Sequence, residues 1–350
     1  MKLLRLIGLM VIAVVIFFGL FLTYASITYY NPEKDLVVEK YVDPDTLSVD
    51  STYDALIWNI GYAGLGDNMD FFYDEGEKVR DTKERTQQNL DSIGALIHQN
   101  SKREFILLQE VDVDSKRTYH INQLEYFQEI LKRVVALGIN YKVNFVPIPP
   151  REPMGMVYSG IATFSTYKPV DSRRYAYPGQ FDWPVRLFNL RRCMLVNRYP
   201  LNNNRNLLII NTHKSAFDDG SLKKLEMDFL KEYILSEYLK GNYVIVGGDW
   251  NQSPPGFKLN TFGDNYEVDF FKMTNIDSTF IDPEWKWVFD STTPTNRYLS
   301  TVYKPGETYC SILDFYLTSP NIEVLTCKTY HQNFRWSDHN PVAISFKLKN

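Results

Sequence analysis

Cysteine is scarce in this chain of 350 residues, and its three copies, Cys193, Cys310 and Cys327, stand far apart. Three scattered cysteines are too few for a disulfide framework or a zinc cluster, so small domains stabilised by disulfides or by zinc are excluded. The chain also lacks an excess of positive charge, because 42 acidic residues outnumber 38 lysines and arginines. An acidic chain is not built to hold nucleic acid tightly and without specificity, although a local basic patch is compatible with this balance.

The rest of the composition is typical of a globular protein. Hydrophobic residues make up 44% of the chain and charged residues 23%, which excludes disordered and collagen-like proteins. The aromatic share of 15% favours a large core rich in strands. No repeat and no linker interrupts residues 52–350, so this stretch is expected to form one domain.

The first 30 residues contain a long uncharged run. No charged residue occurs from Leu6 to Pro32, and Leu6–Leu22 is apolar throughout. A helix needs roughly 20 such residues to cross a membrane. Because Lys2 and Arg5 precede the run and acids follow it, the N-terminus is expected in the cytoplasm and the rest outside. Residues 1–30 are therefore predicted to be a single-pass membrane anchor, with the rest of the chain extracytoplasmic.

A cleaved signal peptide and a buried helix are the alternatives to this anchor. A signal peptide has an apolar region of about 7–15 residues and a cleavage site of small residues. The run here is longer, and Thr23-Tyr24-Ala25-Ser26 is a poor site, so an uncleaved anchor is favoured. Residues 31–51, which are acidic and contain Pro32 and Pro44, are predicted to be a linker. A flexible chain of 20 residues would span about 25 Å.

Short apolar runs predict strands, and amphipathic stretches predict three helices. Many of the runs are apolar on both faces, which is typical of strands covered on both sides. Strands are expected over Tyr53–Trp58, Phe105–Gln109, Lys142–Val146, Ser159–Phe164, Cys193–Val196, Leu207–Asn211, Tyr243–Val246, Ile312–Leu317, Ile322–Lys328 and Val342–Lys347. Helices are expected from an N-cap at Asp81 to Ile97, from Leu124 to Val134, and after Ser221 on a stripe of Leu222, Leu225, Phe229 and Tyr233.

Polar side chains stand where several of these strands end. Because strand ends can converge at one rim of a sheet, such residues often form a site. Carboxylate and amide oxygens without thiolates suit magnesium, manganese or calcium better than zinc. The residues are Asn59, Glu110, Asn211-Thr212-His213, Asp249 with Asn251, Asp314, and Asp338-His339 in the last loop.

These phrases resemble those of the endonuclease/exonuclease/phosphatase superfamily, which has the deoxyribonuclease-I-like fold. The resemblance covers roughly Tyr53 to Leu348, and each phrase is weak alone, but six in the family's order form a strong joint signal. The resemblance implies an α/β fold, in which a two-sheet β-sandwich is flanked by helices in four layers, α/β/β/α. The phrases are Trp58-Asn59-Ile60, Leu108-Gln109-Glu110, Asn211-Thr212-His213, Gly248-Asp249-Trp250-Asn251, Leu313-Asp314-Phe315 and Ser337-Asp338-His339-Asn340-Pro341-Val342.

The resemblance further implies a magnesium-dependent phosphoesterase site, with manganese or calcium as substitutes. Glu110 resembles the principal magnesium ligand, Asn59 the residue that steadies the metal cluster, and Asp338 another metal-associated acid. Asp249 resembles the acid that orients or deprotonates the attacking water or contacts a metal. Asn251 is expected to donate to a phosphate oxygen, on an extended backbone that points it the same way as Asp249.

Two histidines complete the expected site. His339 resembles the catalytic histidine, acting as a base or as a cation that stabilises the transition state, and Asp314 resembles its partner. His213 is expected to donate to the scissile phosphate or to protonate the leaving oxygen. Whether Asp249 or His339 is the base, and whether one or two metals act, stays open.

Two segments bear on the substrate. Acids in residues 64–83 would repel a long polyanion, whereas Arg186, Arg191 and Arg192 could bind phosphate or form a salt-bridge cluster. With the anchor, these segments favour a phosphate ester, such as a lipid headgroup or a small ester, hydrolysed outside the cytoplasm. The alternative is a surface-anchored endonuclease with nucleic acid as its substrate. A catalytically silent binding module is disfavoured, because all six phrases are complete.

Overall fold

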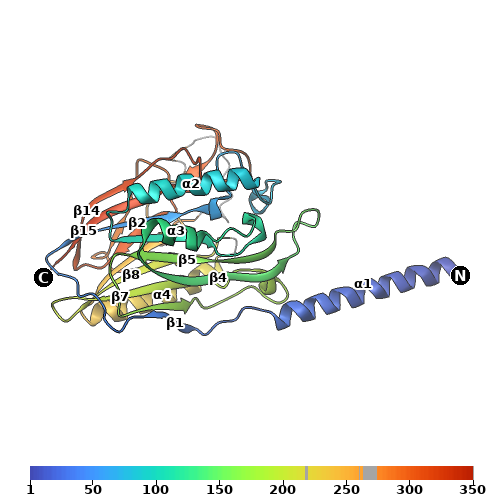
Figure 1. The fold of residues 1–350 in the computed structure, drawn as a ribbon, viewed down its shortest axis with the longest axis horizontal. Coiled ribbons are helices and arrows are strands. Elements are labelled where there is room, and N and C mark those ends of the chain that lie inside the picture. The colour runs from blue at the N-terminus through green and yellow to red at the C-terminus, as the bar shows by residue number, and fades with distance from the viewer. Residues whose placement is uncertain (217–219, 260, 263–273, 350) are drawn as a thin grey trace.

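The structure is a computed structural model, and it describes all residues except 217–219, 260, 263–273 and 350. Two sheets pack face to face, and helices cover their outer faces (Figure 1). The six-stranded sheet has the order β14 (Ile322–Thr329), β15 (Val342–Leu348), β2 (Thr52–Asn59), β3 (Phe105–Asp112), β5 (Gly155–Ser165) and β4 (Val134–Val146). The seven-stranded sheet has the order β1 (Asp35–Lys40), β6 (Asp171–Ala176), β7 (Cys193–Pro200), β8 (Asn206–His213), β9 (Tyr243–Asp249), β13 (Asp314–Thr318) and β10 (Lys286–Val288).

The remaining elements are helices and one small ribbon. The ribbon pairs β11 (Asn296–Arg297) with β12 (Cys310–Ser311). The α-helices are α1 (Lys2–Ile27), α2 (Lys83–Gln99), α3 (Gln123–Leu131) and α4 (Ser221–Leu239). Single turns of 3-10 helix are η1 (Gly61–Ala63), η2 (Phe72–Asp74), η3 (Lys116–Thr118) and η4 (Val185–Phe188).

The layers follow from the alternation of side chains along the strands. In β2, Ile57 faces the core between the two sheets, whereas Trp58 faces the layer formed by α2 and α3. On the other side, Leu230 and Ile234 of α4 pack on the outer face of the seven-stranded sheet. Strands buried on both faces explain the continuous apolar runs, and the predicted four-layer α/β/β/α sandwich is confirmed.

Two predicted helix boundaries are wrong, each for a local reason. Thr82, not Asp81, caps α2, because the Thr82 hydroxyl accepts a hydrogen bond from the Arg85 amide at 3.2 Å. The second helix ends at Leu131, because Lys132 adopts a left-handed conformation with φ of 51°. Val134 therefore begins β4 and does not extend the helix.

The predicted apolar stripe of α4 is also wrong in part. Phe229 and Tyr233 contact the core only from its edge, and Leu225 is exposed. The buried face is instead centred on Met227, Leu230 and Ile234, and it includes the charged residues Lys223, Glu226 and Glu237. Because charged residues occupy part of the buried face, its pattern of apolar residues is not continuous in the sequence.

Part of the expected linker belongs to the sandwich. β1 pairs with β6 at the edge of the seven-stranded sheet, and Leu47 and Val49 are buried between the sheets. Residues 35–40 are thus an edge strand and not a flexible tether. Apart from this strand, the division into an anchor over residues 1–30, a linker over 31–51 and a catalytic domain over 52–350 stays a prediction.

Helix α1 projects from one end of the sandwich (Figure 1). Its 26 residues are long and apolar enough to cross a membrane, and Ala25 alone among them is buried. A signal sequence meets the same criterion of length and composition.

Candidate active site

The predicted site residues meet at one end of the sandwich. β2 runs parallel to β3, and β8 runs parallel to β9, so each pair of strands ends on the same edge. A cleft of about 210 Å³ opens at this end. Of the eight predicted residues, only Asp314 lies behind its wall, and the others line it: Asn59, Glu110, His213, Asp249, Asn251, Asp338 and His339.

A bulge in β3 aims Glu110 into the cleft. Between Leu108 and Val111 the strand holds one residue more than its partner β5, and Glu110 adopts a φ of 57°. A left-handed residue in a bulge turns its side chain away from the ordinary alternation of the strand. Without the bulge, Glu110 would face the same side as Leu108, toward the helices.

Asn59 joins carboxylates that come from different sheets. Its amide nitrogen donates to Asp249 Oδ2 at 3.0 Å and to Glu110 Oε1 at 3.3 Å, while its oxygen accepts from the Gly61 amide. Gly61 has a φ of 49°, and a Cβ there would lie 2.5 Å from Asp338 Oδ1. The turn after β2 therefore requires glycine to let Asp338 approach.

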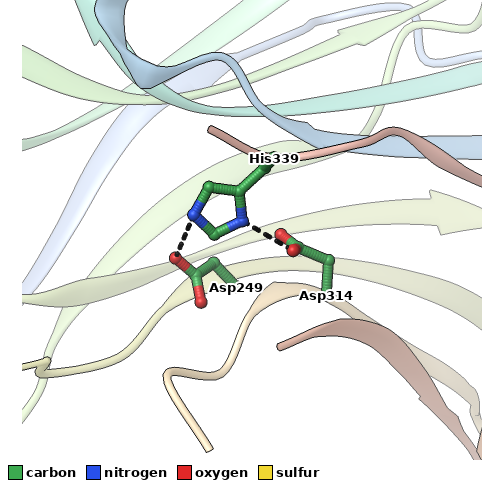
Figure 2. A group of neighbouring side chains, drawn as sticks. All are labelled: Asp249, Asp314 and His339. Atoms are coloured by element: carbon green, nitrogen blue, oxygen red, sulfur yellow. Dashed lines mark hydrogen bonds and ion pairs between the residues drawn. The ribbon is translucent and has the colours of Figure 1, made fainter. Parts of the chain in front are cut away.

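His339 and Asp314 form a buried pair (Figure 2). His339 Nδ1 lies 2.6 Å from Asp314 Oδ2, and His339 Nε2 lies 3.9 Å from Asp249 Oδ2. The Thr295 hydroxyl accepts from the Asp314 amide, which fixes the start of β13. Burial lowers the pKa of His339, but the carboxylates of Asp314 and Asp338 outweigh burial and hold this pKa well above its usual value.

His339 has a second partner that the sequence did not predict. Asn296 Nδ2 lies 3.0 Å from His339 Nε2, and the two residues form an isolated antiparallel bridge. Asn296 stands in Pro294-Thr295-Asn296, which carries no motif, so only the folded chain shows this contact.

The surroundings of His213 shift its pKa in the direction opposite to that of His339. Its Nε2 lies 3.4 Å from Asp249 Oδ2 and 3.8 Å from Glu110 Oε1, while its Nδ1 is buried without a hydrogen-bond partner among the described residues. Burial, together with the positive charges of Arg192 and His339, lowers the pKa of His213 well below its usual value. The surroundings therefore favour the neutral form of His213 and the protonated form of His339 beside the same carboxylate oxygen.

The backbone at Asn251 is not extended as the sequence predicted. Its φ of 49° is left-handed, so the backbone here is not extended. Its amide nitrogen donates to the Lys214 carbonyl at 2.9 Å, and its backbone amide donates to Asp249 Oδ1 at 2.9 Å. Asn251 thus holds Asp249 in place from the wall of the cleft.

The carboxylates of Glu110 and Asp338 are the pair that sequence analysis assigned to a divalent cation. Burial raises the pKa of both, and the negative charge of Asp338 raises that of Glu110 further. Within the described part of the chain, no lysine or arginine forms an ion pair with either carboxylate. Arg117 offsets part of the charge of Glu110, and His339 and Arg297 offset part of that of Asp338, but burial prevails and raises both pKa values. Buried oxygen donors of this kind suit a hard cation. A different group, Asp249, Asp314 and His339, has its ligand atoms within 4.8 Å of one another, but one Asp314 oxygen is already committed to His339.

The basic segment divides between the cleft and the surface. Arg192 lines the cleft, and its Nη1 is buried without a hydrogen-bond partner among the described residues, whereas Arg191 bonds to Gln180 outside the cleft. None of Arg186, Arg191 and Arg192 forms an ion pair with a described residue, so the structure does not support a salt-bridge cluster.

Two acids of residues 64–83 are held by neighbours within or near the segment. Asp67 pairs with Arg85 at 2.7 Å, and Asp70 accepts hydrogen bonds from the amides of Glu77 and Lys78. Asp74 lines the cleft.

A second arginine at the cleft, Arg117, was not predicted from the sequence. Arg117 binds Asp112 through two nitrogens, at 2.8 and 3.0 Å, and its guanidinium lies 3.7 Å from the centre of the Tyr62 ring. Both Arg117 and Tyr62 line the cleft. Neither residue belongs to a motif, and only long-range packing brings the two together.

Comparisons with known proteins agree with this architecture. The family described as Endonuclease/Exonuclease/phosphatase family matches residues 56–339, and no curated protein sequence matches the chain. Among solved structures, an endonuclease/exonuclease/phosphatase from Beutenbergia cavernae is 17% identical with a TM-score of 0.59, covering 85% of this chain and 72% of its own. A protein of the same description from Bacteroides vulgatus is 14% identical with a TM-score of 0.54, covering 85% and 100%.

A third similar structure is D. rerio TDP2 complexed with a single-strand DNA product. It is 12% identical with a TM-score of 0.53, covering 85% of this chain and 100% of its own. At such identities the structures show the fold alone, whereas the family match spans most of this chain. The chain belongs to the endonuclease/exonuclease/phosphatase family, whose members are hydrolases that act on phosphoester bonds.

Proposed function

We propose that this protein is a metal-dependent phosphoesterase that hydrolyses a phosphate ester by in-line attack of water. One observation carries the proposal: a single cleft combines the oxygen donors Glu110, Asp338 and Asp249 with the buried His339–Asp314 pair. A divalent cation held by these carboxylates and a protonated imidazole would supply the positive charge that a phosphate anion requires around it.

Glu110 and Asp338 would hold the metal, and Asn59 would keep Glu110 and Asp249 at a fixed separation through its amide nitrogen. A bound magnesium ion would neutralise charge on the phosphate and help to activate water. Manganese or calcium could occupy the same oxygen donors.

The two histidines then take different tasks. His339, held protonated by Asp314, donates to a phosphate oxygen and stabilises the charge of the transition state. His213, held neutral, donates a hydrogen bond through Nε2 and does not serve as a strong acid. Asp249, which faces both imidazoles, is left to orient the attacking water and accept its proton.

The substrate we favour is a lipid headgroup or another small phosphate ester outside the cytoplasm. The small cleft, lined by apolar residues such as Leu65 and Leu190 beside the charged groups, supports this choice. The apolar helix α1 supports membrane anchoring. The second candidate is a surface-anchored endonuclease, which the similarity to TDP2 bound to a single-strand DNA product favours.

Activity of the full chain on a panel of substrates tests the chemistry. The panel comprises bis-p-nitrophenyl phosphate, sphingomyelin and phosphatidylcholine in vesicles, inositol phosphates and plasmid DNA, each with magnesium and with EDTA. We expect hydrolysis that EDTA abolishes, and hydrolysis that persists in EDTA would contradict the metal site. Preference for DNA over every small ester would favour the endonuclease.

Protease added to intact cells tests the location. We expect cleavage of the body, residues 52–350, without lysis, because the positive residues precede α1 and the body follows it. Protection of the body until every membrane is opened would reverse the proposed orientation.

A further inference from the structure

The last turns of α1 are packed against the sandwich. The Phe21 ring stacks on Phe188 with centroids 5.6 Å apart and meets the edge of Phe145 at 6.2 Å. Asn144 donates to the Tyr24 hydroxyl at 3.1 Å. The direction in which α1 leaves the body is therefore fixed by side-chain contacts.

This junction lies at the end of the sandwich that carries the cleft. β3 and β4 are both antiparallel to β5, so they run in the same direction and end on the same edge. Tyr141 of β4 lines the cleft, and Phe145 lies four residues farther along the strand, about 13 Å away. In Figure 1, α1 projects from the end toward which β4 runs.

A second segment joins the cleft to α1. The Phe188 carbonyl accepts a hydrogen bond from the Tyr141 hydroxyl at 2.9 Å, and the Phe188 ring stacks on Phe21. The next two residues, Asn189 and Leu190, line the cleft. One short stretch of chain thus contacts α1 on one side and forms a wall of the cleft on the other.

Four large hydrophobic side chains around this junction are exposed. Phe145 and Ile148 are each 41% exposed, Trp183 is 54% exposed and Val185 is 51% exposed. We call these four residues the junction patch. Trp183 also donates from its indole nitrogen to the Ser26 hydroxyl at 3.4 Å, so the patch adjoins the root of α1 directly. Within the described residues, exposed hydrophobics outside α1 and this patch, such as Leu239 and Leu325, are scattered over other elements.

The depth of the patch follows from the length of the apolar run. Leu6–Leu22 as a helix spans about 26 Å, close to the roughly 30 Å of a bilayer's hydrocarbon core. Phe21 stands at the end of this run, so its contacts Phe145 and Phe188 would lie at the boundary with the headgroups. Tryptophan and other aromatic side chains are enriched at this depth.

We propose that the junction patch is a second membrane contact, which seats the cleft against the headgroup layer of the bilayer in which α1 is anchored. This inference rests on the proposed function, because it takes α1 as a membrane anchor and the cleft as a phosphoesterase site. Continuity with α1 identifies the bilayer as the occupant of the patch. A body fixed by two contacts keeps one orientation, and a phosphate ester in the headgroup layer then reaches the cleft along the membrane surface.

Fluorescence of the full chain in vesicles tests the contact without activity. Val185→Cys is made in a Cys327→Ser background, where the remaining Cys193 and Cys310 are buried, and it is labelled with an environment-sensitive dye. We expect a blue shift in phosphatidylcholine vesicles and quenching by a lipid-borne quencher. The matched control is Leu239→Cys, which is 85% exposed just before the start of β9, at the opposite end of the sandwich, and should show neither change.

Equal quenching at both positions, or none at position 185, would overturn the membrane contact. A blue shift in lipid-free detergent that rises with protein concentration would assign the patch to a second copy of the chain and would also overturn it.

Kinetics separate the patch from the chemistry. A Trp183→Ser/Val185→Ser variant should lose about tenfold in hydrolysis of a lipid presented in the same vesicles, because the patch no longer holds the cleft at the surface. Hydrolysis of dissolved bis-p-nitrophenyl phosphate should be unchanged, as should both activities of the control Leu239→Ser.

Equal losses on the lipid and the dissolved ester would mean that the patch acts through the fold, which contradicts the inference. If the wild type hydrolyses neither ester, the proposed function fails, and the quenching experiment still decides the contact.

Discussion

The two ends of the sandwich shift the pKa of a glutamate in opposite directions. At the end away from the cleft, Glu237 of α4 accepts hydrogen bonds from Arg198, Lys240 and Asn242 at 2.7–3.0 Å. Burial raises the pKa of Glu237, but these partners outweigh burial and lower the pKa to about 2. At the cleft end, burial raises the pKa of Glu110 without a comparable set of donors. The fold therefore supplies Glu237 with donors for its charge, whereas it gives Glu110 no comparable set.

This contrast separates residues that stabilise the protein from residues that serve its chemistry. A carboxylate with a lowered pKa stabilises the folded state at neutral pH, whereas one with a raised pKa destabilises it there. Proteins retain such destabilising groups where function requires them. Removal of Glu237 and removal of Glu110 should therefore have opposite consequences for stability and activity.

The largest expected effect is that of Glu110→Gln. This change keeps the shape of the side chain and removes its charge, so kcat/KM should fall about 10³- to 10⁴-fold. The melting temperature without metal should stay the same or rise, and the rise caused by magnesium in the wild type should disappear. Kinetics and thermal unfolding with and without magnesium measure both effects.

Glu129→Gln, on an exposed position of α3, is the matched control and should behave as the wild type. Full activity of Glu110→Gln would remove Glu110 from the proposed metal site.

The next effect concerns the His339–Asp314 pair. His339→Ala should lower kcat/KM about 10³-fold, and Asp314→Asn about 10²-fold, because the asparagine keeps the ring in place but no longer supports its charge. The double variant should be little worse than His339→Ala alone, since one unit is removed in both cases. Additive losses in log(kcat/KM) would show that the 2.6 Å contact does not join the two residues in function.

A smaller effect is expected at His213. His213→Ala should lower kcat/KM about 10²-fold, and His213→Gln should recover part of the loss, because a glutamine amide can still donate a hydrogen bond. A proton donor to the leaving oxygen could not be replaced in this way, so equal losses in the two variants would favour that role. Near-normal activity in His213→Ala would leave the histidine with a structural role only.

The smallest effect on activity is expected at the opposite end. Glu237→Gln should leave kcat/KM unchanged but lower the free energy of unfolding at pH 7 by about 1–3 kcal/mol. Because the pKa of Glu237 is lowered by folding, its contribution is present above about pH 4.5 and is lost as the pH falls toward 2. Urea unfolding of both proteins at pH 7 and pH 3 should show the difference shrinking, and a constant difference would contradict the assigned cause.

The sequence by itself determined the family, the layers and the polar residues that end the strands at the rim. Strands buried on both faces leave continuous apolar runs, and the polar residues that end them, such as Asn59 and Glu110, stand out against those runs. These signals are local, so reading along the chain was enough. The same reading failed where local signals compete, as at Asp81 and Thr82, which are both good helix caps.

Only the tertiary structure decided the contacts and the charges. Asn296 and Arg117 reach the cleft from segments without a motif. The two histidines have pKa values shifted in opposite directions, although both approach Asp249 Oδ2, at 3.4 and 3.9 Å. The physical reason is that a side chain's charge state depends on burial and on neighbours far away in the sequence, and both exist only after the two sheets have packed.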